Sequence, residues 1–142
     1  MSFDDLYQEV IRDHYKNPRN KEKLGEEVPT FQNPSCGDMV KLQLVVNSEN
    51  ILEKVIFDGS GCSISMCSAS MMTDLLSGKP VKEAAAVLEH FLEVIRGEKP
   101  VGDLEELGEL AALGGVIQLP VRVKCATLAW NALGEALQSH LK

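Results

Sequence analysis

The sequence predicts an α+β domain: a small antiparallel sheet of three strands with helices packed on one face. Apolar and polar residues alternate over residues 39–46 and 51–57, on either side of a polar tetrapeptide, which is typical of a β-hairpin. Most other apolar residues recur at helical spacing, in segments bounded by glycine or proline. Neither a repeat nor a linker is visible, so we expect residues 1–142 to form a single domain.

The first predicted helix runs from a cap at Ser2 to Asn17, where Pro18 follows. A polar connection leads to a short strand at residues 28–32, although Pro29 interrupts it. In the hairpin, even-numbered residues from Val40 to Val46 should share one face. In its second strand the pattern places Ile51, Val55 and Phe57 on one face, and Leu52 and Ile56 on the other.

Four helices should complete the chain. The first follows Gly61 and stops at Gly78, and the second begins at Pro80 and stops at Gly97. A short acidic helix is expected over residues 103–113, closed by Gly114 and Gly115. The last helix should start near Pro120 and continue to about His140.

The composition and charge of the chain argue against nucleic-acid binding and membrane insertion. Apolar residues make up 44% and charged residues 25% of the chain, as in globular proteins. A net charge of −7 opposes nucleic-acid binding. No apolar run approaches the roughly 18 residues of a membrane span, and the start of the chain lacks a secretory signal. We therefore expect a cytoplasmic protein that has neither nucleic-acid nor membrane partners.

Four cysteines in a reducing compartment indicate metal binding or thiol chemistry and not disulfides. Cys36 and Asp38 lie two residues apart in a predicted turn, while Cys62 and Cys125 fall where helices should begin, positions that favour a thiolate. Together these residues offer three sulfurs and one oxygen, which can close a tetrahedral zinc site. The alternative is three buried cysteines and an aspartate that caps its own turn.

Other candidate ligands are set aside. Cys67 does not share a helical face with Cys62 and is expected to be a small buried hydrophobe. His14, His90 and His140 lie on different predicted helices, without a cysteine or acidic partner nearby in sequence, and should be mostly solvated.

Four motifs resemble the NifU-like/IscU superfamily of iron–sulfur cluster assembly proteins. They are Asp13-His14-Tyr15-Lys16-Asn17-Pro18-Arg19-Asn20, Asn33-Pro34-Ser35-Cys36-Gly37-Asp38, Gly61-Cys62-Ser63-Ile64-Ser65 and Lys124-Cys125-Ala126-Thr127-Leu128. Their order and spacing resemble the family over nearly the whole chain, and most of all its SufU branch. The resemblance implies the IscU/NifU scaffold fold, with the four proposed metal ligands gathered at one exposed end.

Two departures from IscU-type scaffolds favour the SufU branch. Lys124 stands where those scaffolds carry a histidine, and an ammonium is a poor ligand, so Asp38 would be the fourth ligand. The chain also has an extra segment, roughly residues 97–116, which IscU-type proteins lack.

The resemblance implies a zinc-dependent sulfurtransferase. Such a protein receives persulfide sulfur from a pyridoxal-phosphate cysteine desulfurase of the SufS type and passes it towards Suf cluster-assembly proteins. Cys36 would be the sulfur acceptor, and Arg122, one turn before Cys125, would offset the negative charge of the site.

Two alternatives remain open. The first is an iron–sulfur scaffold in which Cys36, Cys62 and Cys125, with Asp38, hold a transient cluster. The second is a purely structural zinc domain that acts by binding a partner.

Overall fold

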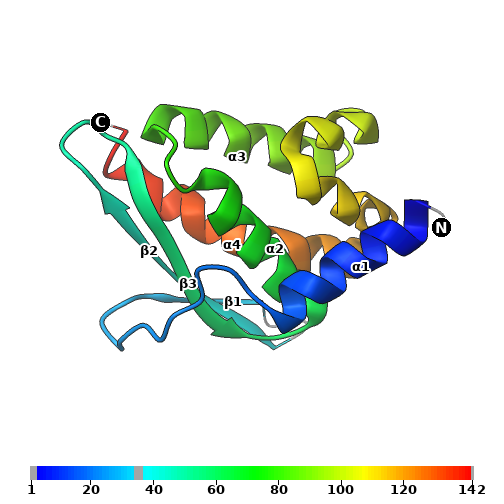
Figure 1. Cartoon of the computed structure of the whole chain (residues 1–142), viewed down its shortest axis with the longest axis horizontal. Helices are drawn as coiled ribbons and strands as arrows, with labels where there is room; N and C mark the ends of the chain where they lie inside the picture. Colours follow the sequence, from blue (N-terminus) through cyan, green and yellow to red (C-terminus); the bar gives the residue numbers. More distant parts are fainter. Residues whose placement is uncertain (1–2, 34–36, 142) are drawn as a thin grey trace.

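The computed structural model describes residues 3–33 and 37–141, and it confirms the predicted α+β class (Figure 1). Its elements follow in the order α1 (Phe3–Lys16), β1 (Thr30–Asn33), β2 (Asp38–Val46), β3 (Leu52–Ser60), α2 (Ser63–Leu76), α3 (Val81–Ile95), the 3-10 segment η1 (Val101–Gln118) and α4 (Pro120–Gln138).

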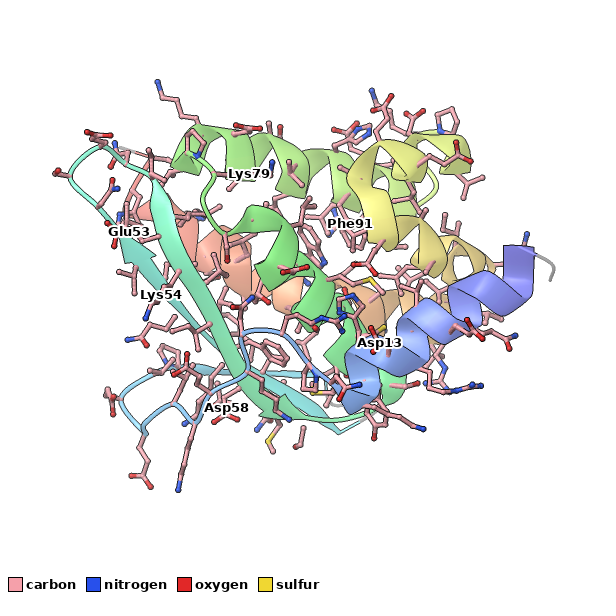
Figure 2. All side chains as sticks on the ribbon, in the orientation of Figure 1. Asp13, Glu53, Lys54, Asp58, Lys79 and Phe91 are labelled. Carbon is pink, nitrogen blue, oxygen red and sulfur yellow. The ribbon has the colours of Figure 1, made fainter. Side chains whose placement is uncertain are left out.

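The sheet is three-stranded and antiparallel, with strand order β1-β2-β3. The strands β2 and β3 contact α4 and α2 respectively, and α3 and η1 pack on α4 (Figure 1). The core lies between the sheet and this layer of helices. Between the helices, the fully buried Phe91 of α3 stacks on Trp130 of α4, with ring centroids 4.2 Å apart, and Figure 2 shows Phe91 pointing inward from α3.

The predicted faces of β3 are wrong at its start. Leu52 is fully buried in the same core cluster as Val55 and Phe57, instead of on the opposite face. The pairing between β2 and β3 shifts register after Val45, because β3 carries one extra residue at this point. Such a bulge reverses the alternation of side chains. The predicted faces of β2 are confirmed by its burial pattern.

The first strand also differs from its predicted range. It covers Thr30–Asn33 instead of residues 28–32, and pairs with β2 from Thr30↔Lys41 to Asn33↔Asp38. Pro29 precedes it because proline has no N–H to donate to the ladder. As a result, Asn33 and Asp38 face each other at the end of the sheet.

Four predicted helices are confirmed as α1, α2, α3 and α4, but the predicted bounds of the acidic helix are not. Instead of stopping at Gly114, η1 continues to Gln118, and it is interrupted at Leu107 and Gly108. Gly108 adopts φ 65°, a left-handed conformation that glycine tolerates without strain. This kink divides η1 into two short helical pieces.

The connection after α1 is clamped onto α2 by polar contacts. Its backbone N–H at Arg19 donates to Ser70 Oγ over 2.8 Å, and Asn20 donates its side-chain amide to Thr73 Oγ1 over 3.2 Å. Arg19 also pairs with Asp13, 2.6 Å away, which lowers the pKa of the Asp13 carboxyl through this hydrogen bond. Figure 2 shows Asp13 on α1 beside this connection.

The expectation that His14 is solvated is wrong. His14 is fully buried, with Nδ1 2.7 Å from Ser70 Oγ and Nε2 3.2 Å from Glu109 Oε1. Its partners come from α2 and η1, far away in the sequence, so local sequence gave no sign of them. None of the helices within the described residues is long and apolar enough to span a membrane.

Candidate metal centre

Asp38, Cys62 and Cys125 meet at one end of the fold, with one possible ligand atom from each lying within 4.8 Å of the others. They come from the first residue of β2, the residue before α2 and the second turn of α4. Cys36, the fourth predicted ligand, lies outside the described residues. Three of the four predicted ligands are therefore brought together by elements that are distant in sequence.

Asp38 is buried and holds the start of α2. Its Oδ1 accepts the backbone N–H of Cys62 over 2.8 Å, and its Oδ2 lies 3.7 Å from the Cys62 sulfur. Asp38 thus joins β2 to the start of α2, whereas the alternative interpretation had it capping only its own turn. One carboxylate oxygen thus fixes the backbone, while the other is directed towards the sulfur.

Cys62 occupies the predicted place at a helix N-terminus. It is the N-cap of α2, and its sulfur accepts the N–H of Ser65 over 3.5 Å. The half-buried sulfur of Cys62 is thus held at the start of α2 between a backbone N–H and the Asp38 carboxylate.

The prediction for Cys125 is wrong in detail. The helix begins at Pro120, so Cys125 lies in the second turn, where its sulfur is 3.6 Å from the carbonyl oxygen of Val121. The dipole effect falls off within the first turn, so the predicted support from a helix N-terminus does not apply to Cys125. Instead, the buried Asn33 amide donates to this sulfur over 3.9 Å.

Asn33 is a site residue that the sequence argument missed. The sequence contained a clue to it, because Asn33 is the first residue of the motif at residues 33–38. In the structure it pairs with Asp38 across β1 and β2. A second missed feature is Gly61, which allows close packing. A Cβ at Gly61 would collide with Asp38 Oδ1 and Ser65 Oγ, so any larger residue would disturb the carboxylate.

The fourth cysteine of the chain is chemically separate. Cys67 is fully buried and donates to the carbonyl oxygen of Ile64 over 3.5 Å. Burial, with a smaller contribution from the charge of Cys62, raises the pKa of Cys67 to about 12. Cys67 is thus a neutral thiol at physiological pH, as its expected role as a small hydrophobe requires.

The described donors fit a zinc-type ion. Two sulfurs and one carboxylate oxygen lie close enough to share one tetrahedral ion, whose bonds of about 2.0–2.3 Å suit this donor set. A cavity of about 230 Å³, lined by Gln32, Asn33, Gly37, Asp38 and Met39, opens beside the group. Arg122, the predicted supporting residue, has an exposed side chain on the first turn of α4.

The model of the NifU-like N terminal domain matches residues 6–142. The chain belongs to this family. It is 45% identical over 133 residues to the zinc-dependent sulfurtransferase SufU of Bacillus subtilis, an alignment that covers 93% of this chain and 89% of the relative. It is 43% identical over 134 residues to the iron–sulfur cluster assembly scaffold protein IscU of Streptococcus pyogenes serotype M1, covering 94% and 83% of the two chains.

A solved structure supports the same family membership. The crystal structure described as a putative iron–sulfur cluster assembly scaffold protein for the SUF system from Fervidobacterium islandicum superposes with a TM-score of 0.80 at 30% identity. The match covers 96% of this chain and all of the other. These comparisons confirm the resemblance and the IscU/NifU-like fold inferred from the sequence motifs.

Proposed function

We propose that this chain is a zinc-dependent sulfurtransferase that accepts persulfide sulfur for iron–sulfur cluster assembly. The observation that carries the proposal is the convergence of Asp38, Cys62 and Cys125 on one point. Its similarity to the SufU protein of Bacillus subtilis supports this function over other uses of a thiolate-rich site.

Each residue of the site has a distinct part in the proposal. Asp38, Cys62 and Cys125 would hold zinc together with Cys36, and Arg122 would offset the negative charge of the thiolates. When bound, zinc keeps the thiolates deprotonated and protects them from chance oxidation. The sequence predicts a turn around Cys36, whereas Cys62 and Cys125 are held by helices, so Cys36 would be the ligand best suited to leave and react.

The transfer step needs no external oxidant. The Cys36 thiolate attacks the terminal sulfur of the donor persulfide and forms a new sulfur–sulfur bond. The donor's own sulfur–sulfur bond breaks, and its cysteine leaves as a thiolate. One sulfane sulfur has then moved to Cys36, and the number of thiolates is unchanged.

The sulfur donor in this proposal is a pyridoxal-phosphate cysteine desulfurase of the SufS type, and Suf cluster-assembly proteins are the recipients. The reaction is assigned to the reducing cytoplasm. Cys62, the half-buried cysteine of the group, is not in a disulfide, which supports a site that works with thiolates.

The proposal predicts that Cys36→Ser abolishes stimulation of the desulfurase, because a hydroxyl cannot accept sulfane sulfur. Cysteine desulfurase turnover would be measured with each variant, and mass spectrometry would locate the added sulfur of 32 Da. Cys67→Ala is the matched control, since that buried thiol lies outside the cluster and should leave stimulation intact. Persulfide on Cys62 or Cys125, or undiminished stimulation by Cys36→Ser, would refute the assignment of Cys36.

The scaffold alternative keeps one specific support, the similarity to proteins named IscU. Its ligands would be the same four residues, now holding a transient cluster. Metal analysis of protein purified without air separates the two functions. Tight stoichiometric zinc supports the sulfurtransferase, whereas labile iron with acid-labile sulfide supports the scaffold.

A further inference from the structure

Two histidine–glutamate contacts fasten η1 to the rest of the fold. Glu109 Oε1 lies 3.2 Å from Nε2 of His14 on α1, and Glu106 Oε2 lies 3.6 Å from Nε2 of His90 on α3. Both glutamates belong to the segment that the sequence resemblance marks as an addition to IscU-type scaffolds. Neither contact takes part in the site described above.

The His14 contact reaches beyond η1 to α2. A carboxylate can only accept, so Nε2 of His14 donates to Glu109. The other ring nitrogen, Nδ1, lies 2.7 Å from Ser70 Oγ, which already accepts the N–H of Arg19. In the neutral ring with its proton on Nε2, Nδ1 is an acceptor, so the Ser70 hydroxyl donates to it. Glu109 is thereby connected through one buried ring to the helix that Cys62 caps.

The His90 contact is the looser of the two. Its Nε2 is buried and has no hydrogen-bond partner within the described part of the chain, where the nearest carboxylate oxygen is the one on Glu106. A buried ring nitrogen without a partner is destabilising, and a small shift of the exposed Glu106 side chain would supply the missing partner. This geometry favours keeping η1 close to α3.

The two glutamates stand on either side of the kink at Leu107 and Gly108. Because the helical path is broken there, Glu106 and Glu109 are directed to different helices. A glycine in a left-handed conformation gives this point no rigidity of its own. Buried leucines on both sides of the kink, such as Leu104 and Leu110, pack η1 into the core, and the two glutamate contacts add links from each piece to α1 and α3.

The end of η1 leads directly into α4. The N–H of Leu119 donates to the carbonyl of Val116, and the carbonyl of Leu119 accepts the N–H groups of Arg122 and Val123. Cys125 follows in the next turn. A displacement of η1 is thus transmitted through hydrogen-bonded backbone to the start of the helix that carries a metal ligand.

We propose that His14, His90, Glu106 and Glu109 are positioning residues: they form a clasp that fixes η1 and thereby sets the position of Cys125 in the metal centre. The effect of the clasp on zinc binding rests on the proposed function. The effect of the clasp on the start of α4 does not, because it can be measured on the zinc-free chain.

The test compares two double variants that remove the same charge. Glu106→Ala/Glu109→Ala breaks the clasp, while Glu98→Ala/Glu105→Ala changes two exposed glutamates nearby. Zinc release to a chromophoric chelator should accelerate about fivefold to tenfold in the clasp variant and less than about twofold in the control. Hydrogen exchange of zinc-free protein should quicken at residues 119–126 in the clasp variant alone.

A third variant separates loss of the hydrogen bond from loss of charge. Glu109→Gln keeps an oxygen that accepts from His14 and should restore slow zinc release relative to Glu109→Ala. The clasp is refuted if exchange quickens within η1 but not at residues 119–126, or if both double variants behave alike. If wild-type protein binds no zinc, the proposed function fails, while hydrogen exchange still decides the clasp.

Discussion

At the scale of single residues, Asp38 performs two tasks with its two oxygens. Oδ1 accepts the N–H of Cys62, and Oδ2 lies beside the Cys62 sulfur. The close approach of Gly61 leaves the carboxylate room to do both. The short aspartate side chain thus orients its neighbouring ligand and remains available as a ligand itself, which is the kind of support that outer contacts give to metal ligands.

We predict that Cys67 is inert towards alkylating agents in the folded protein at pH 8. Its pKa is raised to about 12 by burial, so it carries no thiolate there. In zinc-free protein, the half-buried Cys62 should react with iodoacetamide before Cys67, which should react only after unfolding, as peptide mass mapping would show. Rapid labelling of Cys67 in folded protein would contradict the structure.

The same pKa shift sets a pH dependence. A thiol whose folded pKa is raised stabilises the fold below its unfolded pKa of about 9, and this stability is lost as pH rises towards 12. The melting temperature of the wild type should therefore fall more steeply than that of Cys67→Ala above pH 9. Parallel curves for the two proteins would contradict this prediction.

At the scale of elements, the connection after α1 shows how one hydroxyl can join three parts of the chain. Ser70 Oγ contacts both His14 of α1 and the backbone of Arg19, and His14 continues to η1. The motif at residues 13–20 is thus explained by packing: it ends α1 and fastens the chain to α2.

We predict that Ser70→Ala lowers the free energy of unfolding by about 1–3 kcal/mol, because it leaves a buried ring nitrogen and a backbone N–H unpaired. For a domain of this size, each kcal/mol corresponds to about 2–4 °C in melting temperature. Ser139→Ala, on an exposed residue that ends α4, is the control and should have little effect. Equal melting temperatures for the two variants would show that the hydroxyl is dispensable.

Local sequence predicted the elements better than the contacts between them. Periodicity located α3 because one apolar stripe decides its burial, whereas α2 and α4 are buried over continuous runs and were located mainly by the glycines and prolines that bound them. The bulge near Val45 and the kink at Gly108 could not be predicted, since each is chosen by tertiary packing. For the site, residue types and motifs identified Asp38, Cys62 and Cys125, but the buried contact of Asn33 depends on strand register.

At the scale of the whole molecule, the candidate site joins the main layers. Asp38 belongs to the sheet, and Cys62 and Cys125 belong to the two helices packed against it. A single ion on these residues would connect the sheet to both helices. Its removal should therefore be felt throughout the fold and not only at one loop.

We predict that a strong chelator lowers the melting temperature of the zinc-loaded protein by roughly 10 °C. A ligand present at a thousand times its dissociation constant stabilises the native state by about 4 kcal/mol. The apolar core should nevertheless keep the zinc-free chain folded, with a native circular dichroism spectrum. Identical melting curves before and after chelation would mean that the resting protein holds no metal at these residues.

Both edges of the three-stranded sheet are protected from pairing with another chain. On the outer side of β3, Phe57 bonds to the backbone of Asn20 and Glu22, and Leu52 bonds to Gly78 and Lys79, so passing chain covers this margin at two points. The opposite margin, β1, is four residues long and follows a proline. Exposed strand margins are where chains add to one another and aggregate. The sheet therefore presents little template for fibril growth.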